Sequence, residues 1–124
     1  MGLWVDIQIS SGDAGNVAIV RCEGELDMAT AAKLIEAFDR VGVQRPDEVQ
    51  VDLRGVEFMD STGLGCLTHG ALAFQREGAG FDVLPSEPVK ELLKRAGLND
   101  FLAYHPESPD SVTSHRAARP GEGQ

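Results

Sequence analysis

The sequence is poor in positive charge and in cysteine, and it has no long run of apolar residues. Among its 124 residues, 11 Lys and Arg stand against 20 Asp and Glu, a formal net charge of -9. This balance argues against nucleic acid and anionic membrane surfaces as partners, because both bind to clustered basic side chains. No stretch of about 18 apolar residues is present, so we expect no insertion into a membrane.

Cysteine chemistry and export signals are also lacking. Cys22 and Cys66 are the two cysteines, and both lie in apolar segments without a CxxC motif or a paired His. We interpret them as small buried hydrophobic residues in a reducing cytosol. The first residues, Met1–Asp6, contain neither the basic region nor the apolar stretch of a signal peptide. We therefore expect a cytoplasmic protein with no metal site and no bound cofactor.

The composition is that of an ordinary globular domain, with 42% hydrophobic and 25% charged residues. Apolar residues alternate with polar ones at residues 3–9 and 49–53, which predicts strands there. Shorter apolar segments at residues 17–22, 81–84 and 101–104 are also expected to be strands. Apolar residues recur at helical spacing in Ala29–Val41, in the segment after Gly63 and in the segment after Ser86. The first two strands are joined by turn-forming residues and predict an antiparallel hairpin.

The element order predicts an α/β fold. Helices connect the later strands, which should therefore be parallel with right-handed crossovers. We expect one mixed β-sheet of about four to five strands packed against three to four α-helices. Residues 1–105 should form this domain. Residues 106–124 are rich in Pro and Gly and poor in apolar residues, which predicts a flexible or weakly helical C-terminal tail.

The most informative segment, Val51–Gly65, contains a short turn between a strand and a helix. Asp60 or Ser61 should take the cap position of that helix. A phosphate on Ser61 would lie at the positive end of the helix, where anions are tolerated. From the local pattern alone, a Ser before a helix is most often only a cap.

The same turn does not have the pattern of a catalytic motif. It matches neither GxSxG nor a P-loop, since the Gly spacing differs and no Lys follows. His69 lies about two helical turns beyond Ser61, too far to act as its base. We expect no catalytic residue and no enzymatic activity.

Three segments of the chain resemble STAS domains, and specifically bacterial anti-anti-sigma factors (anti-sigma factor antagonists). Phe58–Gly65 is similar to the Asp-Ser-small-Gly-Leu-Gly turn of that family. Gly24–Asp27 resembles the Gly-Glu-Leu-Asp that precedes its first helix, and Ser86–Leu98 resembles its last well-marked helix. The resemblance covers residues 3 to 105. It stops before the family's common fourth helix, for which the apolar stripe is missing here.

The resemblance implies a partner-switching cycle in transcription regulation, of the kind used in stress response and sporulation. The unphosphorylated protein would bind an anti-sigma factor that is a histidine-kinase-like serine kinase, and would thereby free a sigma factor. The kinase would phosphorylate Ser61, with Thr62 as a second candidate site, and a PP2C-type phosphatase would restore binding. The partner-binding residues by this resemblance are Asp27, Asp60, Ser61, Thr62, Gly63 and Leu64. We expect a monomer or weak dimer.

Two other hypotheses remain open at this point. The chain could be a standalone STAS subunit of an ABC lipid-transport system, in which the same turn contacts an ATPase without obligatory phosphorylation. It could also be a small enzyme with Ser61 as nucleophile, although a base and an oxyanion loop are missing. Around the turn, we expect Thr30 to cap the first helix and Arg54 to pair with a neighbouring carboxylate.

Overall fold

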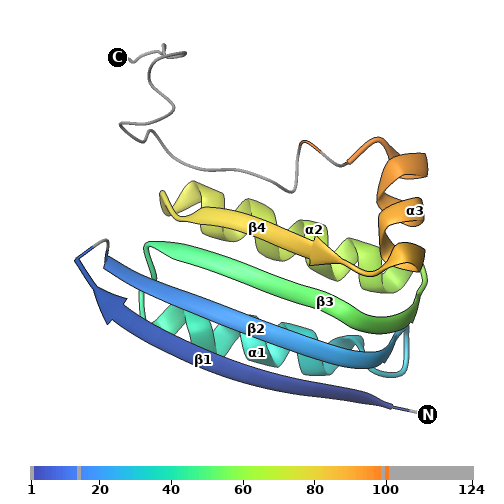
Figure 1. Ribbon diagram of the computed structural model, residues 1–124, viewed down its shortest axis with the longest axis horizontal. Coiled ribbons are helices and arrows are strands. Elements are labelled where there is room, and N and C mark those ends of the chain that lie inside the picture. The colour runs from blue at the N-terminus through green and yellow to red at the C-terminus, as the bar shows by residue number, and fades with distance from the viewer. Residues whose placement is uncertain (1, 14, 99, 101–124) are drawn as a thin grey trace.

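The computed structural model describes residues 2–13, 15–98 and 100, and it forms one sheet with three helices (Figure 1). The elements are β1 (Leu3–Gly12), β2 (Gly15–Leu26), α1 (Ala31–Val43), β3 (Glu48–Met59), α2 (Ser61–Arg76), β4 (Gly80–Pro85) and α3 (Glu87–Ala96). The strand order is β1-β2-β3-β4. β1 and β2 form the antiparallel hairpin, and β2–β3 and β3–β4 are parallel. The expected α/β architecture is therefore confirmed.

The bounds of several elements differ from those expected. α1 begins at Ala31 rather than at residue 29, because a hydrogen-bonded turn occupies the preceding residues. β3 continues to Met59, six residues beyond the expected end, and its register against β2 shifts twice in this extension. The expected strand at residues 101–104 and the C-terminal tail lie outside the described residues.

The core lies between the sheet and the helices α1 and α2, which cover the same face of the sheet (Figure 1). Three aromatic rings join these layers: Phe38 on α1 lies 5.8 Å from Phe74 on α2 and 6.2 Å from Phe81 on β4, centroid to centroid. Gly70 allows this approach, because a Cβ there would collide with the Phe38 ring. α3 packs mainly against β3.

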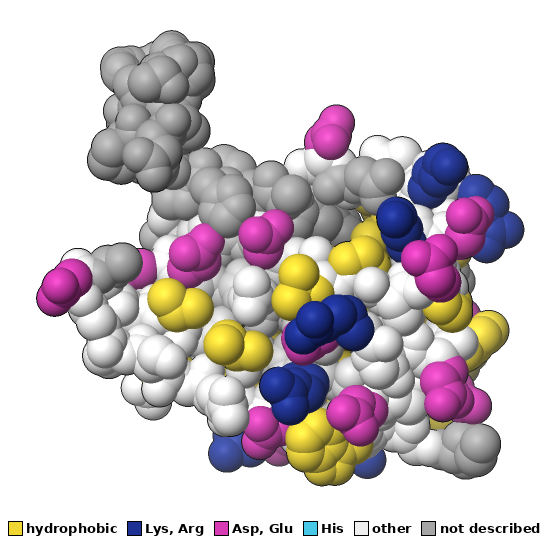
Figure 2. All heavy atoms as spheres, in the orientation of Figure 1, with side chains coloured by type: hydrophobic (Ala, Val, Ile, Leu, Met, Phe, Trp, Pro, Cys, Tyr) yellow, Lys and Arg dark blue, Asp and Glu magenta, His cyan; other side chains and the backbone are white. Residues whose placement is uncertain are grey.

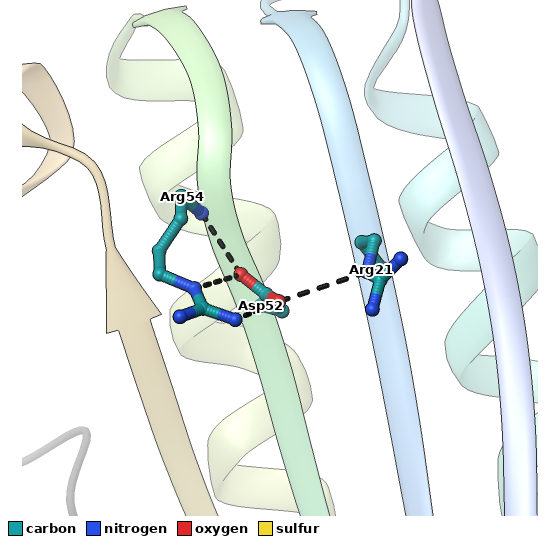
Figure 3. A network of polar contacts seen from close by, with 3 residues as sticks. All are labelled: Arg21, Asp52 and Arg54. Atoms are coloured by element: carbon teal, nitrogen blue, oxygen red, sulfur yellow. Dashed lines mark hydrogen bonds and ion pairs between the residues drawn. The ribbon is translucent and has the colours of Figure 1, made fainter.

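The opposite face of the sheet carries charged and apolar side chains side by side (Figure 2). Asp52 lies buried at its centre and accepts two hydrogen bonds from the Arg54 guanidinium, at 3.0 and 2.9 Å. Arg21, its register partner on β2, lies 3.7 Å from the same carboxylate (Figure 3). The expected pairing of Arg54 is thus confirmed. These contacts hold the pKa of Asp52 below its ordinary value, with the Arg54 side-chain hydrogen bonds as the largest cause.

Candidate functional site

The segments Gly24–Asp27 and Phe58–Gly65 meet where the neighbouring parallel strands β2 and β3 end. Leu26 and Met59 are paired in the parallel register, and the backbone N–H of Asp60 donates to the Leu26 carbonyl at 3.2 Å. Asp27 and Asp60 therefore follow neighbouring strand ends, and the loops that lead into α1 and α2 start side by side. The parallel pairing brings together two acidic residues that are 33 positions apart in the sequence.

Asp60 caps α2 and also connects the two loops. Its Oδ1 accepts a hydrogen bond from the Gly63 N–H at 3.0 Å, which satisfies one of the free donors at the helix start. Its Oδ2 accepts from the backbone N–H of Met28 at 3.3 Å, across the site. Of the two candidates for the cap, the structure selects Asp60. The hydroxyl of Ser61 therefore does not serve as the cap of this helix.

Asp27 and Thr30 hold the turn before α1. The Asp27 carboxylate accepts from the backbone N–H groups of Ala29 and Thr30, at 3.0 and 3.2 Å. The Thr30 hydroxyl lies 2.7 Å from the carbonyl of Glu25, to which it donates, and accepts from the Asp27 N–H at 3.1 Å. Thr30 occupies the cap position of α1, but its side chain makes no cap hydrogen bond. The expected cap position of Thr30 is confirmed, but its hydroxyl closes the turn beside the site and does not bond the free amides of α1.

Gly63 lies where close packing leaves no room for a side chain. A Cβ at this position would lie 2.6 Å from the Leu26 carbonyl oxygen and 2.8 Å from the Leu26 Cγ. Only a residue without a side chain lets α2 start this close to the end of β2. Leu64 is half-buried and packs against the core. Gly63 and Leu64 thus fix the start of α2 against β2 and the core.

Ser61 presents its side chain to solvent at the first position of α2, while Thr62 is half-buried. The backbone amides at this end of the helix favour an anion nearby. Within the described residues, no group of three or more His, Cys, Asp or Glu is placed to hold a metal ion. His69 is exposed on α2, in the second turn after Ser61. The arrangement places an accessible hydroxyl at the start of α2.

Two apolar side chains at the site were missed by the sequence reasoning. Met28, in the loop before α1, is 77% exposed, and Phe58, at the end of β3, is 50% exposed. Met28 lies in a loop outside every periodic segment, so no pattern signals it. Phe58 could have been found from the sequence, because it is a large apolar residue within the Phe58–Gly65 motif. Its neighbours Val56 and Met59 are buried in the core, whereas Phe58 is not. The acidic turn therefore has apolar groups at its rim.

Cys66, one turn along α2 from Thr62, is half-buried. Burial raises the pKa of its thiol, and the Asp60 carboxylate raises it further. Cys22 in the core has its pKa raised to about 12 by burial. Both thiols are therefore neutral at physiological pH, and Cys66 is not an activated nucleophile. No helix in the described part of the chain is long and apolar enough to cross a membrane.

Comparison with known proteins agrees with this geometry. A family model described as "Mlab, STAS domain" matches residues 9–104. The anti-sigma-F factor antagonist RsfB of Mycobacterium tuberculosis is 39% identical over 61 residues, which make up 49% of this chain and 50% of the relative. In that match the chain spans about half of the relative's length. The anti-sigma-B factor antagonist of Listeria monocytogenes is 33% identical over 100 residues, covering 79% of this chain and 86% of the relative.

The fold is shared with a solved relative. The crystal structure of an anti-sigma factor antagonist from Mycobacterium paratuberculosis superposes with a TM-score of 0.68 at 28% identity, over 90% of this chain and 93% of that one. The family match contains Asp27, Asp60 and Ser61 together with nearly all of the described sheet. This chain belongs to the STAS-domain family.

Proposed function

We propose that this protein is an anti-sigma factor antagonist controlled by phosphorylation of Ser61. With Ser61 unmodified, it binds a cytoplasmic anti-sigma factor of the histidine-kinase-like serine kinase type and frees the sigma factor. Phosphorylation by that kinase ends the interaction, and a PP2C-type phosphatase reverses it. The names of the relatives from Mycobacterium and Listeria support the antagonist role.

One observation carries the assignment of Ser61: its side chain is exposed at the start of α2, whereas the bonds that build the turn come from Asp60. A phosphate can therefore be added without loss of the helix cap or of the contact between the two loops. The free amides of the helix start tolerate the new charge. Modification changes the surface of the site and leaves the fold in place.

The charge of the site explains how one phosphate could switch off binding. Asp60 directly precedes Ser61, Asp27 follows the neighbouring strand end, and Glu57 lies near the end of β3. An acidic surface of this kind attracts a partner with basic side chains. Phosphorylation adds about 1.5–2 negative charges to a contact arranged for a neutral group. Desolvating and accommodating the phosphate makes the binding free energy less favourable. Each loss of about 1.4 kcal/mol lowers the affinity tenfold.

A phosphorylation assay with intact-mass measurement tests this proposal. The purified protein is mixed with candidate kinase-type anti-sigma factors and ATP. We expect one added phosphate, lost in Ser61→Ala and retained in the matched variant Thr62→Ala. Ser61→Asp should weaken binding to the anti-sigma factor by at least about tenfold, and a PP2C-type phosphatase should remove the phosphate.

Other outcomes would point to the alternative functions. Tight binding to an ABC transporter ATPase that is indifferent to Ser61→Asp and to ATP would replace the proposal by the transport subunit. Ester hydrolysis abolished by Ser61→Ala would indicate the enzyme. A phosphate that persists in Ser61→Ala but not in Thr62→Ala would move the modified position to Thr62.

A further inference from the structure

A groove runs between α1 and α2 on the side of these helices that faces away from the sheet. It encloses about 650 Å³, and Phe38, Gly70 and Phe74 lie along it where the helices approach each other. Its walls include Ile35 and Val43 from α1 and Thr62, Gly65 and Cys66 from α2. Hollows of this size, mainly apolar with a few polar groups, are typical of binding sites.

The groove exposes apolar surface that packing within the domain does not use. Ile35 is 47% exposed and Val43 is 79% exposed, although both are large hydrophobic residues. A Cβ added at Gly65 would have no heavy atom within 4 Å, so this glycine leaves open space in the α2 wall. Exposed large apolar side chains at a concave surface are typical of contacts with another molecule.

The groove is continuous with the proposed partner site. Thr62 forms part of its wall and is the residue next to Ser61. From Thr62 the lining residues extend along α2 to Glu77, which at 1.5 Å per residue is about 22 Å. This length matches about four turns of a helix. A partner that covers Ser61 therefore meets one end of the groove.

Charge defines the chemistry of the occupant. Asp39 and Glu77 line the groove, and none of its lining residues in the described structure is Lys or Arg. Asp60 lies at the Ser61 end. Between them the lining is mostly apolar, with His69 and with Cys66, whose thiol stays protonated. An apolar helical face flanked by Lys or Arg complements both features.

We propose that this groove is a second docking surface, which takes an amphipathic helix with flanking basic residues from the same anti-sigma factor that contacts Ser61. The inference rests on the proposed function and extends it, because it adds a contact that phosphorylation does not touch. The phosphoacceptor turn then supplies the switch, and the groove supplies apolar binding energy and selectivity among kinases.

Two matched pairs of variants test the groove. Val43→Gln makes an exposed groove residue polar, and Leu72→Gln does the same on α2 outside the groove. Gly65→Leu fills the groove, and Gly12→Leu adds the same side chain in the distant hairpin, where a Cβ also has open space. Affinity for the anti-sigma factor is measured by calorimetry, and thermal unfolding verifies the fold of each variant.

We expect Val43→Gln and Gly65→Leu to weaken binding by about tenfold or more, with both control variants within about twofold of wild type. Wild-type affinity in both groove variants, while Ser61→Asp still weakens binding, would overturn the groove and leave the proposed function intact. Absence of any binding by the wild type would overturn both. A wild-type dimer that Val43→Gln dissociates would identify a second copy of this chain as the occupant and overturn the proposal.

Discussion

At the scale of single residues, Gly63 and Gly65 are the same amino acid, two positions apart on α2, in very different surroundings. Gly63 is buried against the end of β2, whereas the space beyond Gly65 is open. The motif contains both glycines, so the sequence pattern treats them alike. The structure separates a glycine needed for packing from one that leaves a surface accessible.

Alanine substitutions measure this difference. Gly63→Ala should lower the free energy of unfolding by about 1–3 kcal/mol, because its Cβ would overlap Leu26 and the helix would have to move. Gly65→Ala should leave stability unchanged or raise it by up to about 1 kcal/mol, since Ala favours the helix. Urea unfolding monitored by circular dichroism gives both values. Equal stabilities of the two variants would contradict the packing assigned to Gly63.

At the scale of elements, β2 and β3 are coupled by charge on the face of the sheet that α1 and α2 leave uncovered. Asp52 is buried between Arg54 on its own strand and Arg21 on β2 (Figure 3). Both arginines keep much of their surface in solvent, so one buried carboxylate is compensated by two partly hydrated cations. The network ties the parallel pair together near the point where their register shifts.

Acid titration of stability tests this network. The pKa of Asp52 is lower in the folded protein than in the unfolded chain, so folding favours its ionised form. This contribution is complete above the ordinary Asp pKa of about 3.9 and is lost as pH falls through the lower folded-state value. Wild type should therefore exceed Asp52→Asn in stability at pH 7, with the difference shrinking below about pH 4.

The matched control for this titration is Asp13→Asn, at an exposed position in the hairpin turn. Its stability should follow wild type across the same pH range, as measured by chemical unfolding. A constant difference between wild type and Asp52→Asn down to pH 2 would contradict the role of the charged network.

At the scale of the whole molecule, the net charge of -9 belongs mainly to residues 1–105. Residues 106–124 contain three acidic and two basic residues, so the excess lies within residues 1–105. Asp60 and Asp27 lie at the strand ends beside α2 and α1, and Asp39 and Glu77 line the groove between these helices. A field of one sign accelerates association with a basic partner and is screened by salt.

The salt dependence of association follows from this charge. The rate constant for binding the anti-sigma factor should fall by about tenfold or more between low and high ionic strength, while dissociation changes less. Stopped-flow fluorescence at several salt concentrations separates the two rates. Asp27→Asn should reduce the salt dependence more than Asp13→Asn, which removes a charge far from the site. An association rate independent of salt would exclude electrostatic steering.

The element order and the position of the turn could be predicted from the sequence, because both depend on local patterns. Period-two alternation marked β1 and β3, and short apolar runs marked β2 and β4. Helical spacing marked α1 and α2, and the turn residues Asp60 and Gly63 marked the junction between β3 and α2. Element ends were less predictable. β3 extends beyond the residues that alternate, because its pairing with β2 continues through the register shifts. Such pairing joins residues far apart in the sequence, so the local pattern does not predict it.

By itself, the sequence determined the α/β class, the acidic character and the presence of a Ser beside a helix start. Only the tertiary structure decided that Asp60 caps α2 and reaches Met28, that Thr30 closes the neighbouring turn, and that a groove extends from Thr62 between the helices. These features join residues from separate strands and helices. Local propensity acts over a few neighbouring residues, whereas such contacts exist only after the sheet has brought β2 and β3 together.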